Sequence, residues 1–182
     1  MRFVLRYRGR LHSNGSTRDK AELRRALSPQ LEVLWKLGAL KEHNELLAPS
    51  PSGEHYSAVR SRDGATYVPL VSAQLKGLAD LDILLLRPGT PGGLITQGGD
   101  IDNRLKTLFD ALSMPQNDNQ VLPEDRDLPR VYCVVENDAL ISSVSVRTEQ
   151  LLDPGVSDKD VELIMTVTTR VTRRVPGNDF LA

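Results

Sequence analysis

Several residue types are scarce in this chain of 182 residues, and each scarcity excludes a class of protein. A single cysteine, Cys133, rules out an internal disulfide and a cysteine-rich zinc site. The three histidines, His12, His43 and His55, show no metal-ligand spacing, which argues against a histidine zinc site. Aromatic residues make up only 4% of the chain, so aliphatic side chains must build most of the core.

The sequence also lacks a long apolar run. Runs such as residues 83–86 are far too short to cross a bilayer. The first six residues, Met-Arg-Phe-Val-Leu-Arg, lack the apolar stretch and cleavage site of a signal peptide. We therefore expect a cytoplasmic protein with no membrane partner.

The net charge of −1 argues against strong nonspecific binding of nucleic acid. Basic residues are nevertheless concentrated near the start of the chain, at Arg2, Arg6, Arg8, Arg10, Arg18, Lys20, Arg24 and Arg25. Two interpretations stay open. These side chains are either solvated faces of a strand and a helix, or a local surface that follows a phosphate backbone.

Hydrophobic periodicity predicts many strands and few helices. Strands are expected at residues 3–11, 66–71, 78–86, 131–135, 140–146 and 161–171, with a hairpin turn at residues 62–64 joining residues 55–60 to residues 66–71. Helices are expected at residues 20–27, from Ser28-Pro29 up to a stop at Gly38, and at residues 101–113. Residues 48–53, 87–99 and 114–129 are predicted loops. The pattern indicates an α+β fold, a mixed β-sheet with a few helices, in one domain over residues 1–182.

The most informative segment contains three carboxylates, an amide and an ammonium group within three helical turns: Asp100, Asp102, Asn103, Lys106 and Asp110. Helical geometry places the last four on one polar arc beside an apolar stripe, with Asp102 and Lys106 near enough to pair. Carboxylates held close together repel each other unless a cation neutralises them, and oxygen ligands suit Mg²⁺ or Mn²⁺. The preceding glycines and the helix N-terminus favour a phosphate.

Other acidic pairs in the chain are interpreted as unrelated to a site. Asp80 and Asp82 lie in a predicted strand, whereas Asp118, Asp125 and Asp127 lie in a predicted loop. None of them has the accompanying helix, amide and lysine.

The longer string, Asp-x-Asp-Asn-x-x-Lys-x-x-x-Asp-Ala-Leu over residues 100–112, resembles the signature of the RusA family of Holliday-junction resolvases. The later segment of residues 136–141, Glu-Asn-Asp-Ala-Leu-Ile, is similar to the family's second acidic segment. Asp138 falls at its ligand position, and Glu136 is a lesser candidate. The resemblance covers roughly residues 78–146.

The resemblance implies a RusA-like fold and a Mg²⁺-dependent endonuclease of DNA recombination and repair. By resemblance, Asp100, Asp102 and Asp138 would bind Mg²⁺ or Mn²⁺, and Lys106 would assist catalysis. Asp110 would lie on the helix surface or support the ligands. The partners would be branched or other structured DNA and a second copy of the chain, since the family acts as a homodimer.

Two other functions stay open. The chain could be a non-catalytic nucleic-acid-binding module, which its low basicity favours. It could also be another metal-dependent phosphohydrolase, such as a nucleotide pyrophosphatase, in which paired acids and a lysine could also serve.

Overall fold

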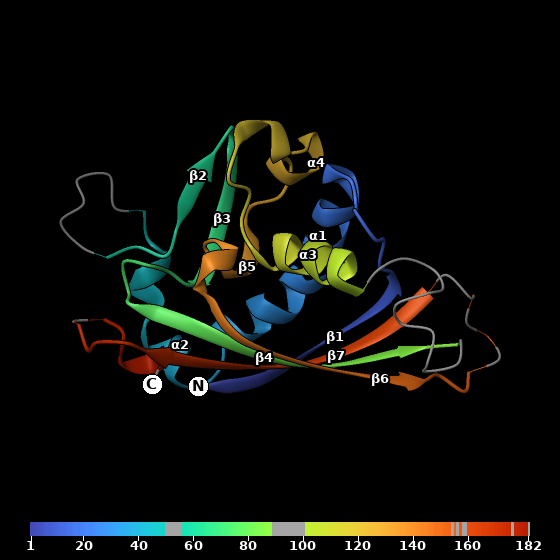
Figure 1. The fold of residues 1–182 in the computed structure, drawn as a ribbon. Helices are drawn as coiled ribbons and strands as arrows, with labels where there is room; N and C mark the ends of the chain where they lie inside the picture. The colour runs from blue at the N-terminus through green and yellow to red at the C-terminus, as the bar shows by residue number, and fades with distance from the viewer. Residues whose placement is uncertain are drawn as a thin grey trace.

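A computed structural model describes residues 1–49, 56–88, 101–153, 155, 157, 160–175 and 177–181. Most of the predicted loops at residues 48–53 and 87–99 lies outside these ranges. The predicted α+β class is confirmed: two mixed β-sheets are combined with a few helices (Figure 1).

The larger sheet has the strand order β1-β7-β4-β6. Its strands are β1 (Arg2–Arg10), β7 (Asp160–Val171), β4 (Gly77–Arg87) and β6 (Ile141–Gln150). β7 is antiparallel to both of its neighbours, whereas β4 and β6 are parallel. In β4, Leu81, Ile83 and Leu85 alternate with less buried residues, because successive side chains of a strand point to opposite faces. The four corresponding strand predictions are confirmed.

The smaller sheet has the order β2-β3-β5, formed by β2 (Arg60–Arg62), β3 (Ala65–Val71) and β5 (Val131–Val135). β2 and β3 form the predicted hairpin, with Asp63 and Gly64 at φ values of 44° and 79° in the turn. β2 begins only at Arg60, the last residue of its predicted strand. Before β2, the Ser57 hydroxyl donates to the Ala48 carbonyl and accepts the Val59 N–H. These side-chain hydrogen bonds take the place of the backbone hydrogen bonds of a strand.

The longest helix, α1 (Thr17–Trp35), is capped at Ser16. The predicted break at Ser28-Pro29 is wrong, because the helix continues through Pro29. Proline removes one helical N–H, but Leu31 and Trp35 extend the buried stripe of the first half of the helix, and their burial favours continuation. α1 ends before the predicted stop at Gly38, which begins the short α2 (Gly38–Glu42), followed by the 3-10 turn η1 (Asn44–Leu47).

Helix α3 (Ile101–Leu112) confirms the helix predicted at residues 101–113. The segment that follows is not the predicted plain loop, because it contains η3 (Asp118–Gln120) and α4 (Pro123–Arg126). Asp125 of α4 is buried, with its carboxylate 2.7 Å from Arg25 Nη1 and 2.9 Å from the Tyr67 hydroxyl. These bonds anchor the segment to α1 and β3. Two further 3-10 turns are η4 (Asp138–Leu140) and η5 (Asp179–Leu181).

The two sheets share a core made mainly of leucine, valine and isoleucine, as the scarcity of aromatic residues predicts. α1 contacts β5 of the smaller sheet, β1 of the larger sheet and α3, so it joins the parts of this core (Figure 1). Trp35 is buried within the core. Burial of Cys133 raises the pKa of its thiol to about 12, so this cysteine is an inert apolar group. Within the described ranges, no helix has the length and apolar character needed to cross a membrane.

Candidate functional site

Helix α3 presents the polar arc predicted from its sequence. Leu108, Ala111 and Leu112 are buried, whereas Asp102 and Lys106 are exposed. Asp110 lies further along this polar arc and is half-buried. The apolar side of the helix therefore holds it against the core and leaves two acids and a lysine on its other side.

The second acidic segment forms η4, which lies against α3. The Asn137 side chain accepts the Ala139 N–H at 3.0 Å and so caps this turn. Asp138 is exposed, and its carboxylate forms no hydrogen bond or ion pair with any other residue that the structure describes. A carboxylate in this position is available to a ligand.

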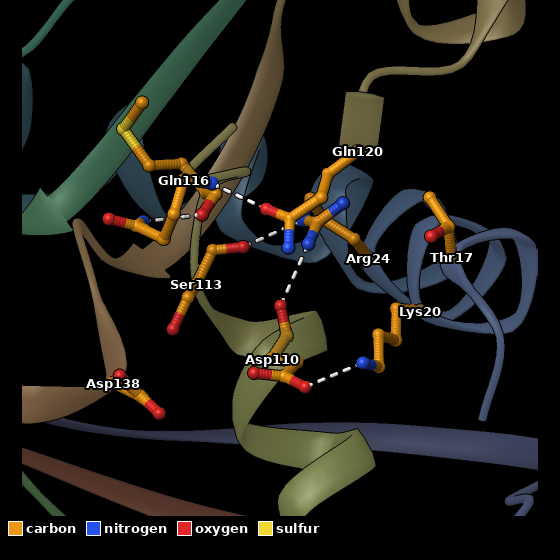
Figure 2. A pocket seen from close by; sticks show the side chains of 9 residues that line it. Thr17, Lys20, Arg24, Asp110, Ser113, Gln116, Gln120 and Asp138 are labelled. Carbon is orange, nitrogen blue, oxygen red and sulfur yellow. Dashed lines mark hydrogen bonds and ion pairs between the residues drawn. The ribbon is translucent and has the colours of Figure 1, made fainter. Parts of the chain in front are cut away.

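Asp138 and Asp110 line one pocket, which Figure 2 shows together with side chains of α1. Lys20 of α1 reaches across it, with its Nζ atom 2.7 Å from Asp110 Oδ2. Both partners of this ion pair are about one-third exposed or less. The pocket thus combines an ammonium group, a carboxylate paired with it, and a second carboxylate with no such cation.

Arg24, also on α1, fixes the end of α3 beside this pocket. Its Nε donates to the Ser113 carbonyl and its Nη2 to the Asp110 carbonyl, each at 2.7 Å. Carbonyl groups at the C-terminus of a helix lack partners within the helix and carry partial negative charge, which a guanidinium group satisfies. Arg24 is only 5% exposed, so these bonds are shielded from water.

A second pair of basic residues lies near the start of α3. Burial, and then the nearby positive charge of Arg87 in β4, lower the pKa of Arg104. Arg104 also donates from Nη1 to the Leu11 carbonyl, which holds its guanidinium group beside the chain that leaves β1. The positive charges of Arg87 and Arg104 thus lie near enough to interact.

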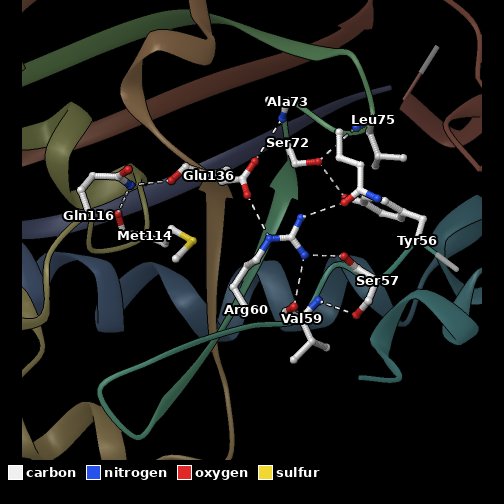
Figure 3. Close-up of polar contacts among 11 residues, drawn as sticks. Tyr56, Ser57, Val59, Arg60, Ser72, Ala73, Leu75, Met114, Gln116 and Glu136 are labelled. Carbon is white, nitrogen blue, oxygen red and sulfur yellow. Dashed lines mark hydrogen bonds and ion pairs between the residues drawn. The ribbon is translucent and has the colours of Figure 1, made fainter. Parts of the chain in front are cut away.

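Glu136, the lesser of the predicted acidic candidates, is fully engaged within the fold (Figure 3). Its carboxylate accepts Arg60 Nε at 2.9 Å and the Ala73 N–H at 3.1 Å. Its backbone N–H donates to the Val71 carbonyl at 2.8 Å, and its carbonyl accepts Gln116 Nε2 at 2.7 Å. These bonds fix the chain just before Asp138, which identifies Glu136 as an anchor of this segment.

The predicted metal ligands are only partly described. Asp100 lies outside the described residues, Asp102 lies on the exposed face of α3, and Asp138 lies in the pocket, which Asp102 does not line. Among the described residues, no group of three or more histidine, cysteine or acidic side chains is arranged to hold a metal ion. The structure thus brings Asp138 together with Asp110, while the trio that includes Asp100 stays a prediction.

The basic start of the chain is largely paired with acids. Arg6 lies 2.8 Å from Glu162, Arg8 lies 2.6 Å from Asp153, and Arg18 lies 3.0 Å from Glu124. Such pairing reduces the positive charge that a phosphate backbone would meet. This arrangement favours the interpretation as solvated faces over a phosphate-following surface.

The other acidic pairs contain structural residues, in agreement with their interpretation from the sequence. Asp80 lies 3.2 Å from Arg170 and also binds the Ser142 hydroxyl. Asp125 is the buried anchor of α4, and burial followed by its hydrogen bond raises the pKa of Tyr67.

Sequence reasoning missed Lys20 and Arg24 as residues of the pocket. Both were recognised only as members of a basic cluster, and no local pattern reveals that α1 crosses the end of α3. Comparison of the sequence with protein-family models and with curated proteins gives no match in either set.

Proposed function

We propose that this chain is a Mg²⁺-dependent endonuclease of the RusA type, which hydrolyses phosphodiester bonds in branched or other structured DNA. The observation that carries the proposal is the set of charged residues on α3. Asp102 and Lys106 occupy its exposed side, and Asp110 shares a pocket with Asp138 from a distant part of the chain. The residue pattern that resembles the RusA signature supplies the reaction type.

Asp100, Asp102 and Asp138 are the residues that would hold the ion, with Mn²⁺ as an alternative to Mg²⁺. Their oxygen-only donor chemistry fits a hard divalent cation. Asp102 and Asp138 are both exposed, so an ion from solvent can reach both carboxylates. When bound, such an ion would lower the pKa of a water ligand and stabilise charge on the phosphate.

The residues of the chain itself would bind and orient the DNA. The ammonium group of the exposed Lys106 would contact a phosphate oxygen beside Asp102, which lies one helical turn away. Lys20 neutralises Asp110, which reduces the repulsion between this carboxylate and a DNA phosphate. Arg87 and Arg104 add positive charge near the start of α3, where the helix N-terminus also favours an anion.

The proposal includes a homodimer with two active sites. A four-way junction has two-fold symmetry, so two symmetry-related sites would cut matching strands. This assignment rests on the resemblance to the RusA family.

Cleavage of a labelled four-way junction in Mg²⁺ tests the proposal, with a linear duplex of the same sequence as the substrate control. We expect the wild-type protein to cut the junction, and Asp102→Asn and Asp138→Asn to cut it at least about a hundredfold more slowly. Asp82→Asn is a matched control, because Asp82 is an exposed acid on β4 outside the candidate site. It should cut like the wild type.

Equal cutting by Asp102→Asn and the wild type would remove Asp102 from the mechanism. Binding of the junction in EDTA without any metal-dependent cutting would favour the non-catalytic nucleic-acid-binding module. Release of pyrophosphate from nucleotides, with intact junctions, would instead support a nucleotide phosphohydrolase.

A further inference from the structure

Strand β6 is an edge of the larger sheet, and it is long for an edge strand. It pairs with β4 on one side, and no other strand of the described part of the chain pairs with its outer side. Most of its residues are exposed. An unpaired edge offers a row of N–H and C=O groups to another strand.

The backbone groups directed away from β4 belong to the even-numbered residues of β6. The Leu151 N–H donates to the Arg87 carbonyl of β4 at 2.7 Å, in the register that places Arg87 opposite Gln150. Because backbone groups alternate between the two edges of a strand, Val146, Thr148 and Gln150 direct theirs outward. These residues are therefore the ones that a further strand would bond.

The sequence of β6 is complementary to itself around Thr148. Arg147 and Glu149 lie on either side of this residue, both exposed and on the same face of the sheet. If two copies of β6 pair antiparallel with Thr148 opposite Thr148, each Arg147 lies opposite Glu149 of the other copy, and opposite charges stabilise such cross-strand pairs. A shift of the centre by one residue in either direction sets Arg147 opposite Arg147, or Glu149 opposite Glu149.

The same register also pairs the exposed apolar residues of this region. Val144 is 40% exposed and Leu152 is 84% exposed. With Thr148 at the centre, Val144 of one copy lies opposite Leu152 of the other. Val144 shares the face of the core-facing Val146. Leu152 lies two residues beyond the end of β6, and a strand continued to it in the dimer would set it on the same face, where it and Val144 would bury each other.

We infer that β6 pairs antiparallel with β6 of a second copy of this chain, about a two-fold axis at Thr148, and joins the two larger sheets into one. Charged residues on an edge usually block pairing with other strands. Here Arg147 and Glu149 have opposite charges and lie on either side of Thr148. They disfavour pairing with most other strands, but they favour pairing with a second copy of β6. The inference supplies an interface for the homodimer that the proposed function includes. It is tested on the protein without DNA or metal, so its failure is distinguishable from a failure of the nuclease proposal.

Sedimentation velocity over a wide range of protein concentrations tests the inference. We expect the wild type to form dimers, and Arg147→Glu and Glu149→Arg each to weaken the dimer by about tenfold, because each variant sets like charges opposite each other twice. The double variant, Arg147→Glu with Glu149→Arg, should restore it. Arg2→Glu, an exposed change on the opposite edge strand β1, is the matched control and should dimerise like the wild type.

Amide hydrogen exchange gives a second measurement on the wild type alone. In the dimer, the amides of Val146, Thr148 and Gln150 should exchange slowly, and they should exchange faster on dilution. The amides of Arg147 and Glu149, which bond β4 in a single chain, should stay protected at every concentration. A monomer at all concentrations, a dimer unaffected by both single variants, or a double variant that stays monomeric would each overturn the inference.

Discussion

The Nζ atom of Lys20 lies 2.7 Å from Oδ2 of Asp110 and connects α1 to α3 across the pocket that Asp138 lines. The pair is only partly exposed, so each charge is shielded from water on one side. A carboxylate without this partner would add to the negative charge of Asp138 where a DNA phosphate is proposed to bind. The position of α1 beside α3 therefore determines how much negative charge the pocket carries.

Replacing Lys20 with methionine tests this connection. We expect kcat/KM for junction cleavage to fall by about tenfold, because the carboxylate of Asp110 would repel the substrate phosphate. The free energy of unfolding should change by less than about 1 kcal/mol, as is typical of partly exposed ion pairs. Lys36→Met is the matched control, since Lys36 follows the last residue of α1 and the change removes an exposed pair with Glu32 of that helix. Equal losses of activity in both variants would contradict a local role for Lys20.

Arg24→Met is expected to destabilise the fold far more than Lys20→Met. It leaves the carbonyls of Ser113 and Asp110 without their buried donor, which should lower the free energy of unfolding by about 2–3 kcal/mol. Urea denaturation measures this change. Arg18→Met, which removes an exposed arginine paired with Glu124, should leave the free energy of unfolding nearly unchanged. Similar stabilities of the two variants would show that the Arg24 bonds contribute little.

Most strands of this fold could be predicted from the sequence because burial on one face leaves an alternating pattern. β4 shows this pattern from Gly77 to Leu86, and β7 shows it from Leu163 to Thr169. The break predicted at Pro29 was wrong. Proline favours the start of a helix, but burial of Leu31 and Trp35 in the core favours a continuous helix, and a local pattern does not show this burial. The short helices at residues 118–120 and 123–126 were missed because each is too short to show a periodic pattern.

The candidate site was predictable only in part. The polar arc of α3 follows from helical geometry, and the structure confirms which of its sides is exposed. The meeting of Asp110 with Asp138 depends on how η4 lies against α3, which no spacing within either segment encodes. Lys20 and Arg24 come from still further away in the chain. Their contribution depends on the contact between α1 and α3.

Glu136 offers a test of how the segment before Asp138 is held. Glu136→Gln keeps the shape of the side chain but removes its charge, so its pair with Arg60 is lost. We expect the free energy of unfolding to fall by about 1–2 kcal/mol and junction cleavage to fall with it. Hydrogen exchange of the Ala73 amide, which donates to this carboxylate, should speed up. Glu42→Gln, at the exposed end of α2, is the control for stability and for exchange at Ala73. Unchanged exchange at Ala73 would contradict the anchoring role.

The buried hydroxyl of Tyr67 predicts how stability depends on pH. Burial and the hydrogen bond to Asp125 raise the pKa of Tyr67 in the folded protein. Above about pH 10 the unfolded chain loses the tyrosine proton that the folded protein keeps. The native state then binds more protons than the unfolded state, so the free energy of unfolding falls as pH rises above about 10.

Tyr67→Phe separates this effect from those of the other tyrosines. At neutral pH the variant should be about 1 kcal/mol less stable, because Asp125 loses a buried donor. Above about pH 10 its stability should fall less steeply than that of the wild type, since the group whose proton is retained is gone. Tyr7 and Tyr56 also have raised pKa values, so the slope should decrease without vanishing. Urea denaturation at a series of pH values measures both effects, and parallel curves for the two proteins would show that Tyr67 does not cause the alkaline loss.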